Sequence, residues 1–133
     1  MPWRELPHTA DLLLEITAAS WPALITEAMH AFRKQLGDAD RRRPAETRAV
    51  ELVGLDREEL LVRWLSSHLV WAELDGVLAM GVELSVASET KLTAMVTLHP
   101  AASLTGAVKA VTYHDLRVVE SSAGWRVRIL FDL

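Results

Sequence analysis

The sequence predicts an α+β fold in which two helices pack on one face of a largely antiparallel sheet. Two segments in the first half have apolar residues at helical spacing, every three or four positions. From residue 77 onward the apolar period changes to two, which is typical of strands. Because the helices come early and the strands follow one another late, the expected order is β-α-β-α-β-β-β-β.

The first strand and the first helix are predicted from a short apolar run and the amphipathic segment behind it. The letters LLLEI indicate a buried strand from about Leu12 to Thr17. Ser20 can cap the following helix, which tolerates Pro22 in its first turn, and Gly37 suits its C-terminal end. The apolar stripe of this helix comprises Trp21, Leu24, Ile25, Ala28, Met29, Phe32 and Leu36.

A polar loop, a strand and the second helix come next. Residues 37–46 carry the basic run RRRP between acidic neighbours, which favours a solvated loop over a phosphate contact. Residues 47–54, TRAVELVG, predict a strand. The letters DREE form a capping box in which Asp56 accepts from first-turn amides and Glu59 reaches back. The helix is expected to end at residues 74–76, and its apolar face comprises Leu60, Leu61, Trp64, Leu65, His68 and Leu69.

Four strands joined by short turns are predicted in the second half of the chain. They occupy residues 78–88, 90–100, 107–121 and 125–133. Alternation in the third of these directs Thr112 and His114 toward the core and places Lys109 and Tyr113 on the other side. In the last strand one side comprises Trp125, Val127, Ile129 and Phe131, and the other comprises Arg126, Arg128 and Asp132.

Composition limits the classes of protein to which the chain can belong. Its 133 residues suit one domain, residues 1–133, and half of them are hydrophobic. Without cysteine, neither a disulfide framework nor a thiolate metal site can form. The N-terminus lacks the apolar core of a signal peptide, and no apolar run has the length of a membrane span, so we expect a soluble, cytoplasmic protein. The net charge of −4 argues against nucleic-acid binding by overall electrostatics.

The common catalytic motifs are absent, and a pair of distant carboxylates is the main candidate for chemistry. The sequence has no Gly-x-Ser-x-Gly, no Gly-rich phosphate loop and no His-Glu-x-x-His. Asp11 precedes the first strand, and Asp132 ends the last one, followed by Leu133 with a further carboxylate oxygen. Such oxygens suit a hard cation, Ca²⁺ or Mg²⁺, although spacing alone favours an Asp11 that only caps a turn.

Three blocks of sequence, taken together, resemble the archease family in order and spacing. They are HTAD near the N-terminus, DREELLVRWL at the second helix, and KAVTYHDL…GW…FDL at the end. The resemblance spans nearly the whole chain. It implies a cytoplasmic activator of the GTP-dependent tRNA-splicing RNA ligase that is not itself an enzyme. Such an activator promotes guanylylation of the ligase's active-site histidine and multiple turnover, and contacts RNA only through the ligase.

The resemblance also implies a metal site. Its ligands would be Asp11, Asp132 and a main-chain oxygen of Leu133, and its cation Ca²⁺ or Mg²⁺, with Mn²⁺ as an alternative. Lys109 matches the family's lysine, and we expect a supporting shell comprising His8, Tyr113 and His114.

Two features depart from the family's pattern, and two other functions remain open. Pro7 stands where many members carry an acidic residue, and residues 99–106 are shortened. The first alternative is a stand-alone metal-dependent phosphoester hydrolase, which would need no partner protein. The second is a non-catalytic module that binds a partner through a sheet face, and its function would survive removal of metal.

Overall fold

The strands form two antiparallel sheets in the computed structural model, which describes residues 2–6 and 11–133. The five-stranded sheet has the order β1 (Trp3–Leu6), β2 (Leu12–Ala18), β9 (Gly124–Asp132) and β7 (Ala110–Val111), with β8 (Val119–Ser121) also paired to β9. The four-stranded sheet is built on β6 (Lys91–Leu104), which pairs with β3 (Gly37–Ala39), β4 (Glu46–Val53) and β5 (Val77–Ala87).

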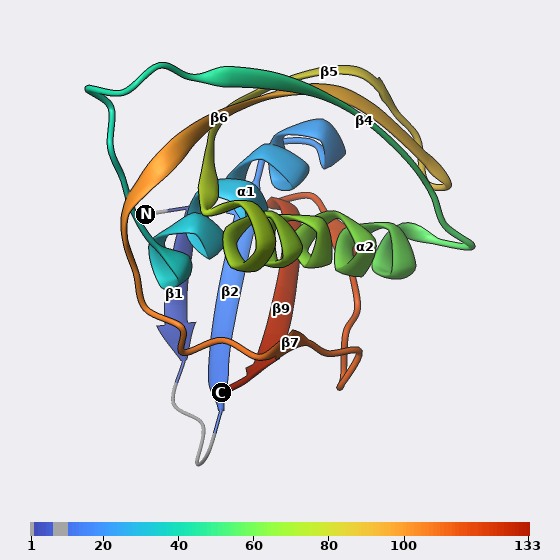
Figure 1. The fold of residues 1–133 in the computed structure, drawn as a ribbon. Coiled ribbons are helices and arrows are strands. Elements are labelled where there is room, and N and C mark those ends of the chain that lie inside the picture. Colours follow the sequence, from blue (N-terminus) through green and yellow to red (C-terminus); the bar gives the residue numbers. More distant parts are fainter. Residues whose placement is uncertain (1, 7–10) are drawn as a thin grey trace.

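Two helices lie between these sheets (Figure 1). The first, α1 (Trp21–Leu36), packs against β2 and β5, one strand from each sheet. The second, α2 (Arg57–Val70), packs against α1, β4 and β7 and continues into a π-helical turn, η1 (Trp71–Asp75). The predicted α+β class and the order of the main elements are confirmed, but the strands divide between two sheets where we expected one. Within the described residues, no helix is long and apolar enough to cross a membrane.

The core joins both helices to the five-stranded sheet. The rings of Phe32 on α1 and Phe131 on β9 stack with centroids 4.9 Å apart. Trp64 on α2 is fully buried, and its indole nitrogen donates to the carbonyl oxygen of Ile25 at 3.0 Å. These contacts pack one face of β9 against the helices, while its opposite face carries the exposed Arg126, Arg128 and Asp132 and the buried Leu130.

Both predicted helix caps are confirmed. The hydroxyl of Ser20 accepts from the amide of Ala23 at 3.2 Å. The carboxylate of Asp56 accepts from the amide of Glu59 at 2.8 Å, and the Glu59 carboxylate accepts from the amide of Leu55. Glu59 thus binds the amide of Leu55, the residue before the cap. Asp56 and Glu59 therefore both supply acceptors for main-chain amides at the start of α2.

Replacing Asp56 with alanine is expected to lower the free energy of unfolding by about 1 kcal/mol. The amide of Glu59 would lose its acceptor at the exposed start of α2. Asp56→Asn keeps a side-chain oxygen in place and serves as the matched control, with a loss of less than about 0.5 kcal/mol. Urea denaturation followed by circular dichroism measures both. Equal losses in the two variants would show that the charge, and not the accepting oxygen, stabilises the helix.

The predicted strand at residues 107–121 is wrong over most of its length. Only Ala110–Val111 and Val119–Ser121 pair with β9, and a turn separates them. The amide of Leu116 donates to the carbonyl oxygen of Tyr113, and Asp115 adopts φ 49°, which aspartate tolerates better than most residues. The local turn chemistry of this stretch therefore overrides its alternating pattern.

Four other features differ from the prediction. The segment before residue 7 forms β1, which the sequence analysis did not predict, and the expected loop at residues 37–46 begins with β3. The second helix reaches residue 75, as expected, but its last part is the π-helical η1. Residues 99–106, which depart from the family's pattern, extend β6 to Leu104.

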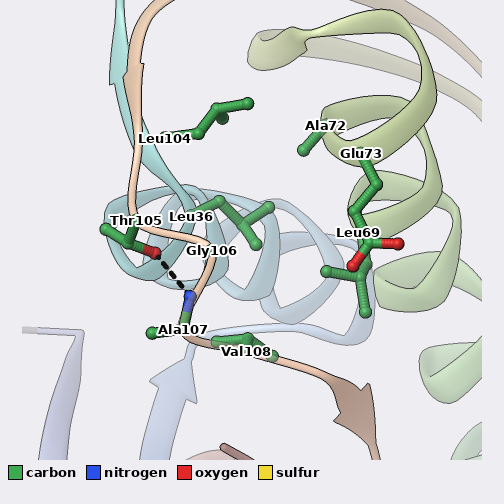
Figure 2. Close-up of a pocket in the computed structure, with 9 residues that line it drawn as sticks. All are labelled: Leu36, Leu69, Ala72, Glu73, Leu104, Thr105, Gly106, Ala107 and Val108. Carbon is green, nitrogen blue, oxygen red and sulfur yellow. Dashed lines mark hydrogen bonds between the residues drawn. The ribbon is translucent and has the colours of Figure 1, made fainter.

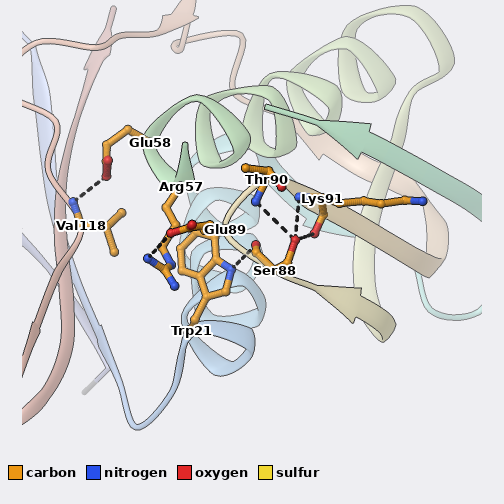
Figure 3. Close-up of polar contacts among 8 residues, drawn as sticks. All are labelled: Trp21, Arg57, Glu58, Ser88, Glu89, Thr90, Lys91 and Val118. Atoms are coloured by element: carbon orange, nitrogen blue, oxygen red, sulfur yellow. Dashed lines mark hydrogen bonds and ion pairs between the residues drawn. The ribbon is translucent and has the colours of Figure 1, made fainter. Parts of the chain in front are cut away.

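A tryptophan–arginine cluster ties the start of α2 to both sheets, and Figure 3 draws its Arg57, Trp21 and Glu89. The guanidinium of Arg57 lies 5.0 Å from the ring centroid of Trp125 and 5.7 Å from that of Trp21, and it pairs with Glu89 at 3.2 Å. Next to it, the carboxylate of Glu58 accepts from the amide of Val118 at 3.1 Å. The start of α2 thereby holds one end of the segment that links β7 to β8.

Candidate functional site

The two aspartates that the sequence analysis associates lie at one end of the five-stranded sheet. β2 and β9 are antiparallel, and their register has Leu12 opposite Phe131. Asp11 directly precedes Leu12, and Asp132 directly follows Phe131. The two aspartates therefore flank the last register pair of β2 and β9, although Asp11 itself lies just outside β2.

Both aspartates belong to the outer face of this sheet, away from the helices. Leu12 and Phe131 are core residues, 7% and 0% exposed. Because side chains alternate across a strand, the residues next to them point to the other face. In agreement with this, Asp132 is exposed and Asp11 is partly exposed.

Lys109 and Leu133 lie at the same edge. The main-chain amide of Lys109 donates to the carbonyl oxygen of Asp132 at 2.8 Å, and Ala110 is the register partner of Asp132. The side chain of Lys109 is exposed, and its main chain is joined to this end of β9. Leu133 follows Asp132 directly and is 47% exposed, which leaves its main-chain oxygen close to the same edge.

The donor chemistry of this edge fits a hard divalent cation. Asp11 and Asp132 supply carboxylate oxygens, and Leu133 supplies a main-chain oxygen, which are the ligand types that Ca²⁺ and Mg²⁺ prefer. Across residues 2–6 and 11–133, no cluster of three or more His, Cys, Asp or Glu side chains could hold a metal. A cation held by these residues would therefore keep coordination positions free for water or for a partner's ligand.

Tyr113 and His114 lie on the turn that follows β7. The hydroxyl and the amide of Thr112 both donate to the carbonyl oxygen of Leu130, at 2.9 and 3.0 Å, which anchors the turn to β9. The imidazole of His114 pairs with the carboxylate of Asp115 at 3.3 Å. Tyr113 and His114 are both exposed. The predicted inward orientation of His114 is therefore wrong, because the chain leaves the sheet after Val111.

A hollow of about 250 Å³ separates this turn from the outer face of the sheet. Leu13 and Leu130 line it from β2 and β9, and His114, Asp115 and Arg128 complete its lining. His8 of the expected supporting shell, together with Pro7, falls outside the described residues. The structure thus places His114 near the sheet face that carries Asp132, while Tyr113 is exposed on the same turn.

A row of ion pairs on this face was not predicted from the sequence. Glu15, only 7% exposed, accepts from Arg4 at 2.9 Å and from Arg128 at 2.8 Å. The hydrogen bond from Arg128, and then that from Arg4, holds the pKa of the Glu15 carboxyl below its ordinary value, although burial acts in the opposite direction. The strand pattern identified the side on which Arg128 lies, but only the pairing of β1, β2 and β9 reveals its partner.

A second hollow lies at the C-terminal end of α1 (Figure 2). It measures about 50 Å³ and lies between Leu36, Leu69 of α2 and the segment that leads to Val108. The hydroxyl of Thr105 donates to the carbonyl oxygen of Gln35 and accepts from the amide of Ala107. This volume is too small for a nucleotide, and the segment that precedes Lys109 forms part of its lining.

Comparison with known proteins identifies relatives over the full chain. Residues 3–133 match the model of the Archease protein family (MTH1598/TM1083). The chain is 31% identical to the protein archease of Methanopyrus kandleri over 140 residues, which cover all of both chains. It is 26% identical to the protein archease of Methanosarcina mazei, with 96% of this chain and 93% of the relative covered.

Two solved structures share the fold. Protein 1598 of Methanobacterium thermoautotrophicum, solved in solution, matches with a TM-score of 0.75 at 22% identity, over 99% of both chains. The crystal structure of an archease and possible chaperone from Thermotoga maritima, TM1083, matches with a TM-score of 0.70 at 20% identity. That match covers 98% of this chain and 96% of the other.

Proposed function

Because this chain belongs to the archease family, we propose that it activates the GTP-dependent tRNA-splicing RNA ligase as an accessory protein in the cytoplasm. It promotes guanylylation of the ligase's active-site histidine and supports multiple turnover, without being a ligase itself. The observation that carries this proposal is the register of β2 and β9, in which Leu12 is opposite Phe131. Asp11 and Asp132 directly flank this pair, which supports a site shared by carboxylates from opposite ends of the sequence.

Asp11, Asp132 and the main-chain oxygen of Leu133 would hold a divalent cation at this edge, Ca²⁺ or Mg²⁺, with Mn²⁺ as an alternative. A cation bound there would offset negative charge on the nucleotide phosphates while the ligase histidine displaces pyrophosphate from the α-phosphorus. The role of the protein is to position the ligands, since β9 is packed rigidly against the helices through Phe131.

Lys109 and the neighbouring turn complete the proposed site. The amide of Lys109 fixes its main chain to Asp132, so the exposed ammonium group can offer a second positive charge to the phosphates. His114 and Tyr113 lie on a turn anchored by Thr112 and would limit the directions from which the ligase approaches.

Replacing Asp132 with asparagine is expected to abolish the stimulation of multiple-turnover RNA ligation by the cognate ligase. The substitution preserves size but removes a charged ligand, and loss of a cation ligand reduces affinity by ten-fold or more in order of magnitude. The assay compares ligase alone, ligase with the wild-type protein, and ligase with the variant, in GTP and divalent metal. Glu83→Gln, an exposed carboxylate change on β5 of the other sheet, is the matched control.

The outcomes separate the three functions considered. Stimulation by the Glu83→Gln protein but not by the Asp132→Asn protein supports the proposal. Equal stimulation by both variants would keep the activator role and exclude the cation at this edge. Nucleotide hydrolysis by the protein alone, lost on replacing Asp11, would identify a hydrolase. Failure of the wild-type protein to stimulate an active ligase would favour a binding module.

A further inference from the structure

The outer face of the five-stranded sheet is polarised along the strands. The aspartates lie at one end, and two rows further along β2 and β9 the register pairs Glu15 with Arg128. The next row on the same face pairs Thr17 with Arg126. On β1, Arg4 is opposite Glu15 and so points to the same face. Two strands, β1 and β9, therefore carry arginines on either side of Glu15 of β2, beside an acidic edge.

Arg117 extends this basic region from the segment that links β7 to β8. It lines a hollow of about 140 Å³ together with Arg126 and Arg128, and Asp115 lies at the same hollow. We name the four residues Arg4, Arg117, Arg126 and Arg128 the arginine face. All four are exposed. Against the two carboxylates of Glu15 and Asp115 they leave a local charge of +2, although the chain as a whole carries −4.

The arginine face is held in shape before any ligand arrives. Glu15 is nearly buried and accepts from Arg4 and Arg128 on either side, which orients both guanidinium groups across three strands. The side chains of Arg4 and Arg128 remain 65% and 52% exposed, so their other N–H groups stay accessible. Preorganised guanidinium groups lose less side-chain entropy when they bind an anion, and their planar shape matches phosphate.

We infer that the arginine face binds the phosphate backbone of a single-stranded RNA. Arg126 and Arg128 are two residues apart on β9, which separates them by about 6.8 Å along the strand. That separation is close to the spacing of successive phosphates in a nucleic-acid strand. The surface is open and extended, whereas a nucleoside triphosphate is usually held in a closed loop of main-chain amides.

The neighbouring hollow favours RNA over an acidic protein segment. Leu13 and Leu130 give the 250 Å³ hollow an apolar lining, and Arg128 and His114 line it as well. A nucleic-acid strand alternates charged phosphates with flat bases, and the partly exposed Leu13 offers a base an apolar contact beside Arg128. The inference goes beyond the proposed function, because it adds a direct contact with RNA where the family resemblance implies only an indirect one.

Fluorescence anisotropy of a labelled single-stranded oligouridylate, with EDTA present and at low salt, tests the inference on the isolated protein. The test variant is Arg117→Gln/Arg126→Gln, which leaves the Glu15 ion pairs intact. The matched control is Arg41→Gln/Arg43→Gln, which removes the same charge from the exposed basic loop before β4. Because neither ligase nor metal is present, failure here is distinguishable from failure of the proposed function.

The wild-type protein is expected to bind the RNA with a dissociation constant that rises with salt. The test variant should bind about ten-fold more weakly and lose about 1.4 from the slope of log affinity against log salt, since each contact contributes about 0.7. The loop variant should bind like the wild type, and unlabelled RNA should compete better than polyglutamate.

Four results would overturn the inference. They are absence of RNA binding by the wild-type protein, equal losses of RNA affinity in the two double variants, a loss of RNA affinity confined to the loop variant, and competition by polyglutamate as effective as that by unlabelled RNA. Loss of ligase stimulation in Arg117→Gln/Arg126→Gln, without RNA binding by the wild type, would assign the face to an acidic surface of a protein instead.

Discussion

Replacing Gly37 with alanine is expected to lower the free energy of unfolding by more than about 3 kcal/mol, a loss reserved for a few identifiable mechanisms. Gly37 ends α1 and begins β3 without an intervening loop, and its amide donates to the carbonyl oxygen of Arg33. Its φ of 155° belongs to a region that is essentially confined to glycine. A Cβ at this position would overlap the carbonyl oxygen of Ser103 on β6.

Gly76 provides the matched control for this prediction. It also has positive φ, 65°, at the end of η1, but a Cβ there would have no atom within 4 Å. Gly76→Ala should therefore cost only the left-handed backbone penalty, about 1–2 kcal/mol. Urea denaturation followed by tryptophan fluorescence compares both variants. Similar losses of unfolding free energy in the two variants would show that backbone conformation alone, and not the close approach of β3 to β6, restricts residue 37 to glycine.

The second large effect is expected below pH 6.5, where His68 should make the protein progressively less stable. His68 is 4% exposed, lies edge-on to the rings of Trp64 and Trp71, and its Nε2 atom has no hydrogen-bond partner among the described residues. Burial lowers the pKa of this imidazole from 6.5 to about 3. The native state therefore keeps His68 neutral in a pH range where the unfolded chain protonates it.

The sign of the effect follows from the number of protons bound. Between pH 6.5 and about 3 the unfolded state binds more protons at His68 than the native state, so stability rises with pH. His68 should thus remove about 1.4 kcal/mol for each pH unit below 6.5, and its contribution should be constant above that pH. The lowered pKa of Glu15 adds a loss only around and below pH 4.5.

His68→Leu tests this assignment, because leucine keeps an apolar side chain of similar size and cannot be protonated. Denaturant unfolding at pH 7 and at pH 5 gives the difference in stability for each protein. On going from pH 7 to pH 5, the free energy of unfolding should fall by about 2 kcal/mol more in the wild type than in the variant. His30, whose pKa burial also lowers, is present in both proteins and cancels. Parallel pH profiles would refute the role of His68.

Local sequence signals predicted the elements correctly wherever neighbouring residues decide the structure. Ser20 and Asp56 cap their helices as expected, because a cap joins residues three positions apart. The alternation in β9 also held for Val127, Ile129 and Phe131, which are buried. At residues 107–121 the same reasoning failed, because Asp115 allows a turn that a period-two pattern does not reveal.

The candidate site shows the same division. The sequence by itself determined the residue types, Asp11 before one strand and Asp132 at the end of another, and the resemblance that links them. Only the tertiary structure decided that these strands are neighbours, that Leu12 is opposite Phe131, and that Glu15 joins Arg4 to Arg128. The physical reason is that strand pairing depends on main-chain hydrogen bonds between distant segments, whose register is specified by packing of the whole core.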